Sequence, residues 1–253
     1  MAATTDEQLA ELLDLTSHSD SVELKLTVPL EDQRKAIQAL GLDPLEGQIR
    51  LIYFFDTPDL ALEQAGVVVR ARRVQGKGDD SVVKLRPVVP QELPDELRES
   101  ASFFVEVDAM PGGFVCSGSM KGVPRKASVQ EVFLGEQPLR KLLSKEQRAF
   151  YSAHAPEGIK LDDLVLLGPI FIVKLKGTPA GANRRVVVEL WLYPDGSRIL
   201  ELSTKCAPGE GLQVAGEMRA FLAERGIPTT GDQQTKTRTA LEHFAAHLDA
   251  EAS

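Results

Sequence analysis

The stretch YFFDTPDLALEQAGVVVRARR, residues 53–73, decides the fold of this chain. Its aromatic and β-branched beginning predicts a strand over 49–56. Residues 59–65 then predict one or two helical turns, and Gly66 closes them because glycine tolerates the left-handed conformation at a helix C-terminus. A second strand begins at Val67. The stretch therefore predicts a strand, a short helix and another strand in succession.

The second strand carries neighbouring arginines on one face. Val68, Arg70 and Arg72 share that face, because successive side chains of a strand point to opposite sides. The other face begins with Val67 and Val69. Two arginines side by side indicate either a solvated surface or an anion site.

Length and charge limit the class of protein. The chain has 253 residues, enough for a sizeable core, and a formal charge of −8, which argues against general binding to nucleic acid or to acidic membranes. No stretch approaches the roughly 20 apolar residues of a membrane helix. The first residues lack the basic and then apolar pattern of a signal peptide, so we expect a cytoplasmic protein. Two cysteines, Cys116 and Cys206, are expected to be free thiols.

Alternating polar and apolar residues predict eight strands in all. They lie at 21–28, 49–56, 67–73, 81–87, 101–109, 169–176, 184–193 and 198–206. Helical patterns occur between them and at the C-terminal end, whereas the glycine-rich stretch 110–128 indicates turns. The predicted fold class is α+β, built around a large antiparallel sheet or barrel.

Charged residues recur two apart on one face of strand after strand. They are Lys25, Arg70, Arg72, Lys84, Arg86, Lys174, Lys176, Arg185 and Lys205, with Glu23, Glu106, Asp108, Glu189 and Glu201 among them. A flat sheet with one wet face would show the same alternation. Basic charge dominates these positions, however, and the helices are available to cover the apolar faces. Both observations favour a barrel with a polar interior.

A basic interior requires anionic partners, because like charges in a confined space repel. The interleaved carboxylates supply some of that charge, and a bound polyanion would supply the rest. Lysine and arginine suit a phosphate chain, while glutamate and aspartate suit a divalent metal. Together they are the groups that phosphoryl transfer requires.

The 53–73 block closely resembles the corresponding block of the CYTH family, the triphosphate tunnel enzymes. That family includes class IV adenylate cyclases, thiamine triphosphatases and inorganic triphosphatases. Further elements follow in the family's order: a near-match to E-x-E-x-K at residues 21–25, K-x-R at Lys84 and Arg86, E-x-D at Glu106 and Asp108, basic residues at Lys174 and Lys176, a carboxylate strand at Glu201, and T-K-T-R ending at Arg238.

The resemblance implies an eight-stranded antiparallel closed barrel, or tunnel, with helices packed outside. This tunnel domain extends over 18–240, with a helical insertion at about 124–158 and a C-terminal helix of the same domain over 241–253. The resemblance also implies Mg²⁺ or Mn²⁺ as cofactor and a triphosphate or polyphosphate as ligand. Glu23 and Lys25 are the expected catalytic residues. The expected phosphate-binding residues are Lys25, Arg70, Arg72, Lys84, Arg86, Lys174, Lys176, Arg185, Lys205, Lys236 and Arg238. The expected metal ligands are Glu23, Glu106, Asp108, Glu189 and Glu201.

Two serines depart from the family pattern. Ser21 stands where E-x-E-x-K has its first glutamate, and Ser203 stands at the second place of the later carboxylate pair. Asp20 does not replace the missing glutamate, since its parity turns it to the other face. A serine hydroxyl is a weak neutral ligand for a hard cation. The expected metal ligands are therefore fewer than in the family pattern, whereas the expected phosphate-binding residues are all present.

Three functions remain open on these residues. The first is a metal-dependent hydrolase of inorganic tripolyphosphate or of a nucleoside or thiamine triphosphate. The second is a weakened or inactive polyphosphate- or nucleotide-binding module, and the third is an adenylate cyclase of the class IV type. We expect no nucleic-acid and no membrane partner; a homodimer is left open.

Overall fold

Nine strands close into one barrel, and neighbours pair in the order β1-β5-β6-β4-β3-β2-β7-β8-β9. The strands are β1 (Ser21–Val28), β2 (Gln48–Asp56), β3 (Val67–Val74), β4 (Asp80–Leu85), β5 (Phe103–Met110), β6 (Gly113–Gly122), β7 (Val165–Gly177), β8 (Val186–Leu192) and β9 (Arg198–Cys206). The ring closes where β9 pairs with β1. This computed structural model describes residues 13–229, 233 and 236–251.

The barrel corrects two expectations from the sequence. It has nine strands and not eight, because the stretch 113–122 forms β6 between β5 and β4. It is also mixed and not wholly antiparallel, since β1 and β5 run parallel while β1 and β9 run antiparallel. The α+β closed barrel itself is confirmed.

Strand β6 is hidden in the sequence by its small residues. Glycine and serine have weak strand propensity, so the stretch lacks the usual β-branched signal. Packing explains one glycine: a Cβ at Gly118 would lie 2.7 Å from the ring of Phe103. The ring of Phe103 covers the strand there, and no larger residue fits. Tertiary packing thus overrides local propensity.

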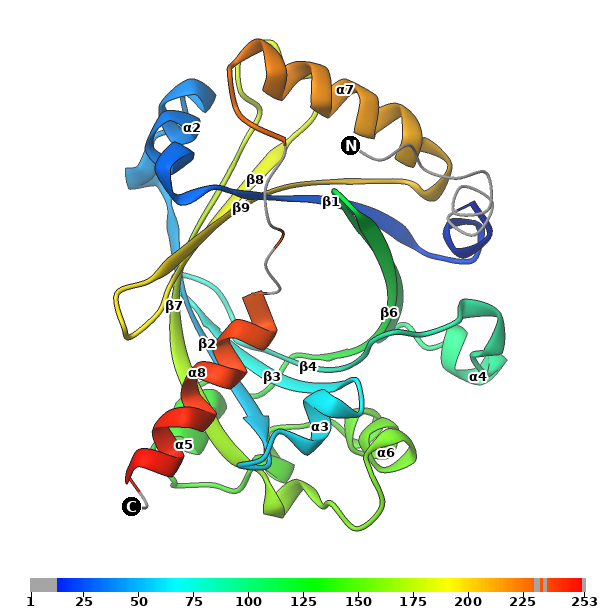
Figure 1. The fold of residues 1–253 in the computed structure, drawn as a ribbon. Helices are drawn as coiled ribbons and strands as arrows, with labels where there is room; N and C mark the ends of the chain where they lie inside the picture. The colour runs from blue at the N-terminus through cyan, green and yellow to red at the C-terminus, as the bar shows by residue number, and fades with distance from the viewer. Residues whose placement is uncertain (1–12, 230–232, 234–235, 252–253) are drawn as a thin grey trace.

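Most helices surround the barrel. They are α2 (Gln33–Leu40), α3 (Ala61–Gln64), α4 (Asp95–Arg98), α5 (Ser128–Phe133), α6 (Lys145–His154), α7 (Gly211–Glu224) and α8 (Lys236–Glu251). Short 3₁₀ turns join them at Leu30–Asp32, Pro44–Glu46, Pro90–Glu92, Leu139–Lys141, Leu161–Asp163 and Pro208–Glu210. In Figure 1, α2, α4, α6 and α7 lie around the ring of strands. None of the described helices is long and apolar enough to cross a membrane.

Helix α8 differs from the other helices because it packs on the inner side of the barrel wall. Its buried residues Ala240 and Leu241 belong to one apolar cluster with Ile52, Ile172 and Trp191, which also line the barrel cavity. In Figure 1, α8 (red) lies within the outline of the strand ring. The expectation that the helices pack outside therefore holds for the others but not for α8.

Candidate functional site

A buried carboxylate organises the turn between β2 and β3. Asp56, 1% exposed, ends β2 and accepts hydrogen bonds from the backbone N–H groups of Leu62 (2.8 Å) and Glu63 (3.0 Å). Gly66 follows with φ +73°, and a Cβ there would lie 2.4 Å from the carbonyl oxygen of Arg86. The glycine lets the start of β3 approach the end of β4. This local construction fixes the register that turns Arg70 into the barrel.

The barrel encloses a cavity of about 1380 Å³. Fifteen basic and seven acidic side chains line it, so the cavity has an excess of eight positive charges in a chain whose formal charge is −8. The basic residues are Lys25, Arg50, Arg70, Arg72, Lys77, Lys84, Arg86, Lys121, Lys174, Lys176, Arg184, Arg185, Lys205, Lys236 and Arg238. The acidic residues are Glu23, Glu63, Asp80, Glu106, Asp108, Glu189 and Glu201. Confined positive charge of this kind attracts a polyanion.

Every site residue expected from the sequence lines this cavity. They are Glu23, Lys25, Arg70, Arg72, Lys84, Arg86, Glu106, Asp108, Lys174, Lys176, Arg185, Glu189, Glu201, Lys205, Lys236 and Arg238. Asp20, by contrast, accepts a hydrogen bond from the backbone N–H of Val105 at 2.6 Å and does not line the cavity. The parity argument about Asp20 therefore holds.

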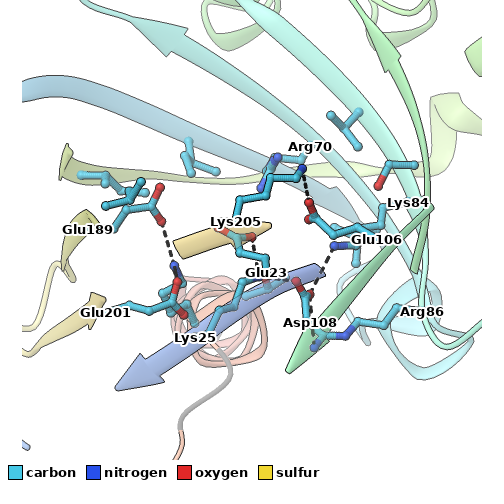
Figure 2. Close-up of a pocket in the computed structure, with 18 of the residues that line it drawn as sticks. Glu23, Lys25, Arg70, Lys84, Arg86, Glu106, Asp108, Glu189, Glu201 and Lys205 are labelled. Atoms are coloured by element: carbon cyan, nitrogen blue, oxygen red, sulfur yellow. Dashed lines mark hydrogen bonds and ion pairs between the residues drawn. The ribbon is translucent and has the colours of Figure 1, made fainter. Parts of the chain in front are cut away.

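Asp108 is the centre of the basic cluster at one side of the cavity. Its side chain is fully buried, and the ammonium of Lys25 lies 2.7 Å from Oδ1. Lys84 Nζ is 3.7 Å and Arg86 Nη2 is 3.5 Å from Oδ2. Neither oxygen accepts a well-formed hydrogen bond from a described residue. Figure 2 shows these side chains converging from β1, β4 and β5.

The pKa values follow from this arrangement. Burial alone would raise the pKa of Asp108, but Lys25 and Lys84 outweigh it and lower that pKa to about 2. Burial would likewise lower the pKa of Lys25, yet the attraction of Asp108 and Glu23 raises it. Lys84 is less strongly attracted by the carboxylates than Lys25 is, and burial lowers the pKa of Lys84 to about 8. Asp108 and Lys25 therefore stay charged over the whole neutral range.

Three carboxylates form a group that fits one divalent cation. Glu23, Glu106 and Asp108 each offer an oxygen, and these atoms lie within 4.8 Å of one another. Oxygen ligands of this kind suit Mg²⁺ or Mn²⁺. The oxygens of Asp108 already lie 2.7 Å from Lys25 Nζ and 3.7 and 3.5 Å from Lys84 Nζ and Arg86 Nη2, so a divalent ion would share this carboxylate with those cations. The donor set and its geometry therefore fit the metal that the sequence led us to expect.

The two serines are hydrogen-bonded to members of this group. Ser21 Oγ donates to Glu106 Oε2 at 3.3 Å, and Ser203 Oγ donates to Glu23 Oε1 at 3.0 Å. Glu106 Oε2 also contacts the ammonium of Lys205. Burial opposes the ionised form of Glu106, but this contact lowers its pKa below the usual range. The serines thus use part of the acceptor capacity of two carboxylates.

The remaining two expected ligands form a separate group. Glu189 and Glu201 face each other across β8 and β9. Lys236 Nζ lies 2.8 Å from Glu189 Oε2 and 2.6 Å from Glu201 Oε1. Lys174 Nζ lies 2.5 Å from Glu189 Oε1. In Figure 2 Glu189 and Glu201 are on the opposite side of Lys25 from Asp108.

Some cavity cations have no anionic partner among the residues that the structure describes. Among the described residues, Arg70, Lys176 and Arg185 form no ion pair. Arg72 differs, since its Nε lies 2.8 Å from Asp80 Oδ1 and its Nη2 lies 2.8 Å from Asp80 Oδ2. Burial and the neighbouring Arg72 lower the pKa of Arg70 to about 10. Arg70 remains charged at neutral pH and is available to an anion.

The sequence reasoning missed several cavity residues. Arg50 lines the cavity from β2. It lies two residues before Ile52 and so shares its face of the strand, which the sequence pattern could have indicated. Asp80 looked like part of a turn but belongs to β4 and pairs with Arg72. Lys121, which looked like a loop lysine, lies on β6 with its Nζ 4.1 Å from the ring centre of Phe104. These residues depend on strand ends and on β6, which the pattern did not delimit.

Two solved structures share this architecture. HpAC1 from Hippeastrum, proposed as an adenylyl cyclase and described as having a dominant triphosphatase activity, superposes with a TM-score of 0.65 at 18% identity, over 87% of this chain and 98% of that one. The protein bh2851 from Bacillus halodurans, proposed as an adenylate cyclase, superposes with a TM-score of 0.60 at 14% identity, over 87% of this chain and 97% of that one. No family model matches the sequence, and no curated protein matches it. The chain therefore has the closed-barrel fold of these two proteins, the fold that the CYTH-like block in its sequence predicts.

Proposed function

We propose that this chain is a metal-dependent hydrolase of a linear triphosphate bound inside the barrel. One observation carries the proposal: the cavity has eight excess positive charges although the whole chain is acidic. A triphosphate carries about four to five negative charges at neutral pH, because its terminal phosphate titrates near pH 6. Such a ligand is opposite in sign to the excess charge of the cavity and offsets part of it.

The cavity side chains divide into three groups by their proposed role. Arg70, Lys176 and Arg185, which form no ion pair with a described residue, bind and orient the phosphate chain, arginine through paired hydrogen bonds. Lys25, Lys84 and Arg86 neutralise charge that develops on the transferred phosphoryl group. Glu23, beside Lys25 at 3.2 Å, accepts a proton from the attacking water at a carboxylate oxygen.

Glu23, Glu106 and Asp108 would hold a divalent ion, which would supply positive charge against the phosphate chain. The likeness to HpAC1, described as having a dominant triphosphatase activity, supports hydrolysis as the reaction. We place the catalytic domain at 18–240, with the helices α5 and α6 inside an insertion at about 124–158. Residues 241–253 belong to the same domain through α8, which ends at Glu251; residues 252 and 253 lie outside the described part of the chain.

Phosphate release tests this function directly. The chain is incubated with tripolyphosphate and with ATP, in Mg²⁺, in Mn²⁺ and in chelator, and phosphate is measured. We expect release that requires the metal and that falls at least a hundredfold in Glu23→Gln, since that variant removes a metal ligand and the proton acceptor. Release that persists in chelator, or in Glu23→Gln, would contradict the proposal. Cyclic AMP measured in the ATP reactions tests the cyclase hypothesis.

A second candidate function, a phosphate-binding module without turnover, is favoured by the two serines. Ser21 and Ser203 occupy carboxylate positions of the family pattern and donate to Glu106 and Glu23. Fewer carboxylates weaken the affinity for a hard cation. The same reactions decide between the candidates when they are combined with calorimetry: tight tripolyphosphate binding without phosphate release would identify the module.

A further inference from the structure

The five carboxylates expected to bind metal do not form one site. Glu189 and Glu201 lie directly opposite each other on β8 and β9. Like charges in this relation destabilise a sheet unless a cation lies between them. Their side chains are only 16% and 9% exposed, so water offers little screening. This pair therefore needs a cation of its own.

The protein supplies that cation itself. The ammonium of Lys236 contacts both carboxylates, at 2.8 Å from Glu189 and 2.6 Å from Glu201, and its side chain is 13% exposed. Lys174, directly across from Glu189 on β7, adds a contact at 2.5 Å. Two carboxylates and two ammonium groups sum to zero charge. The pair is neutral without any metal.

Helix α8 holds the ammonium in place. Lys236 is the first residue of α8, and its carbonyl oxygen accepts a hydrogen bond from Tyr193 Oη at 3.1 Å. One turn further on, Ala240 and Leu241 are buried, 0% and 2% exposed. Trp191 Nε1 donates to Glu189 Oε2 at 3.3 Å and so orients the carboxylate. A divalent ion could bind between Glu189 and Glu201 only by displacing the ammonium of Lys236, which the packing of α8 holds in place.

The group at Glu23, Glu106 and Asp108 is different. Three carboxylates are present there where Glu189 and Glu201 make two, and their oxygens lie within 4.8 Å of one another. The ammonium groups around it come from strands and are shared among several partners. A divalent ion can therefore join this group without removing an element of the fold.

We propose that Lys236 is a tethered cation that takes the place of a second divalent ion at Glu189 and Glu201, so that the chain binds a single divalent ion, at Glu23, Glu106 and Asp108. This deepens the proposed function, on which its choice of metal site rests. It also assigns Lys236 a different role from the phosphate contact expected from the sequence, and it removes two residues from the expected metal ligands.

Titration of the full chain with Mn²⁺ alone, followed by the electron paramagnetic resonance of free Mn²⁺, tests the stoichiometry. We expect one bound ion per chain. Glu201→Gln should change the affinity less than twofold, whereas Glu23→Gln should weaken it at least thirtyfold. Two bound ions, no bound ion, or a tenfold loss of affinity in Glu201→Gln would overturn the inference.

Lys236→Met tests the tethered cation. It should expose Glu189 and Glu201 and allow a second Mn²⁺ ion to bind. Lys35→Met, on the surface of α2 with a side chain 79% exposed, makes the same change of residue elsewhere and should leave one ion. A folded Lys236→Met chain that still binds one ion would overturn the inference. If that variant does not fold, Glu201→Gln alone decides.

The outcome is separable from that of the proposed function. One bound ion without phosphate release would contradict the hydrolase and leave the tethered cation standing. Metal-dependent phosphate release by a chain that binds two ions would support the hydrolase and contradict the tethered cation.

Discussion

The ammonium of Lys25 lies 2.7 Å from Oδ1 of Asp108, a carboxylate that no solvent reaches. Lys25 belongs to β1 and Asp108 to β5, the two strands that run parallel in this barrel. In that register Glu23 is directly opposite Asp108. The parallel pair therefore brings two carboxylates, those of Glu23 and Asp108, together with the ammonium of Lys25. Acidic and basic side chains of the candidate site meet at this point of the cavity.

Replacing Asp108 by asparagine should destabilise the protein. The isosteric amide leaves Lys25, Lys84 and Arg86 without their shared anion, and breaking a buried ion pair from one side costs about 3–5 kcal/mol. The free energy of unfolding in urea measures the loss. Asp162→Asn is the control: its pair with Arg140 is about half exposed, so the loss there should stay below about 1 kcal/mol. Equal losses in the two variants would contradict the central role of Asp108.

Arg70 and Arg72 should respond oppositely to substitution by methionine. Arg70 is without an ion pair among the described residues, so Arg70→Met should raise the melting temperature of the ligand-free chain. Arg72 is paired with Asp80, so Arg72→Met should lower it. Both variants should bind tripolyphosphate about tenfold more weakly or worse, because a hydrogen bond to a charged group contributes about 1.5–3 kcal/mol. Melting curves measure the two opposite shifts in melting temperature, and calorimetry measures the loss of tripolyphosphate affinity. A destabilised Arg70→Met chain would contradict the conclusion that Arg70 has no stabilising ion pair among the described residues.

Stability should rise with pH in the range where Lys84 titrates. Burial lowers the pKa of Lys84 from 10.5 to about 8, assisted by Lys25 and Arg86 against the attraction of Asp108. Between these two values the unfolded chain binds more protons than the folded chain, so the free energy of unfolding increases with pH. Below pH 8 both states are protonated and the contribution of Lys84 is constant. The difference in urea stability between the wild type and Lys84→Met, measured from pH 7 to about 10, should show this slope; a flat difference would contradict it.

Restoring a carboxylate at Ser21 should strengthen metal binding. In Ser21→Glu the new side chain joins Glu106, which Ser21 now contacts at 3.3 Å. An added carboxylate raises the charge of the ligand set, so Mn²⁺ should bind about tenfold more tightly. Without metal, the variant should melt at a lower temperature because like charges repel. Ser152→Glu on the surface of α6 is the control for both measurements; an unchanged Mn²⁺ affinity in Ser21→Glu would show that this position does not supply a ligand.

The sequence by itself determined which charged side chains share one face of a strand. Strand alternation has a period of two, so Arg70 and Arg72, or Glu106 and Asp108, must share a face once either strand forms. The turn closed by Gly66 was also readable, because few residues tolerate a positive φ. The closed barrel was predicted from the charged faces of the strands together with the family resemblance.

Only the tertiary structure decided how those faces meet. The ninth strand, β6, escaped detection because Gly118 is required by the ring of Phe103, a contact between residues 15 apart that no local propensity encodes. The parallel pairing of β1 with β5 joins residues more than 80 positions apart, and it alone places Glu23 opposite Asp108. Lys236 reaches Glu189 and Glu201 because α8 packs on the inner side of the barrel wall. Alternation fixes a side chain's direction, but which opposite charge it meets depends on strand order and helix packing, which are set by the burial of distant residues.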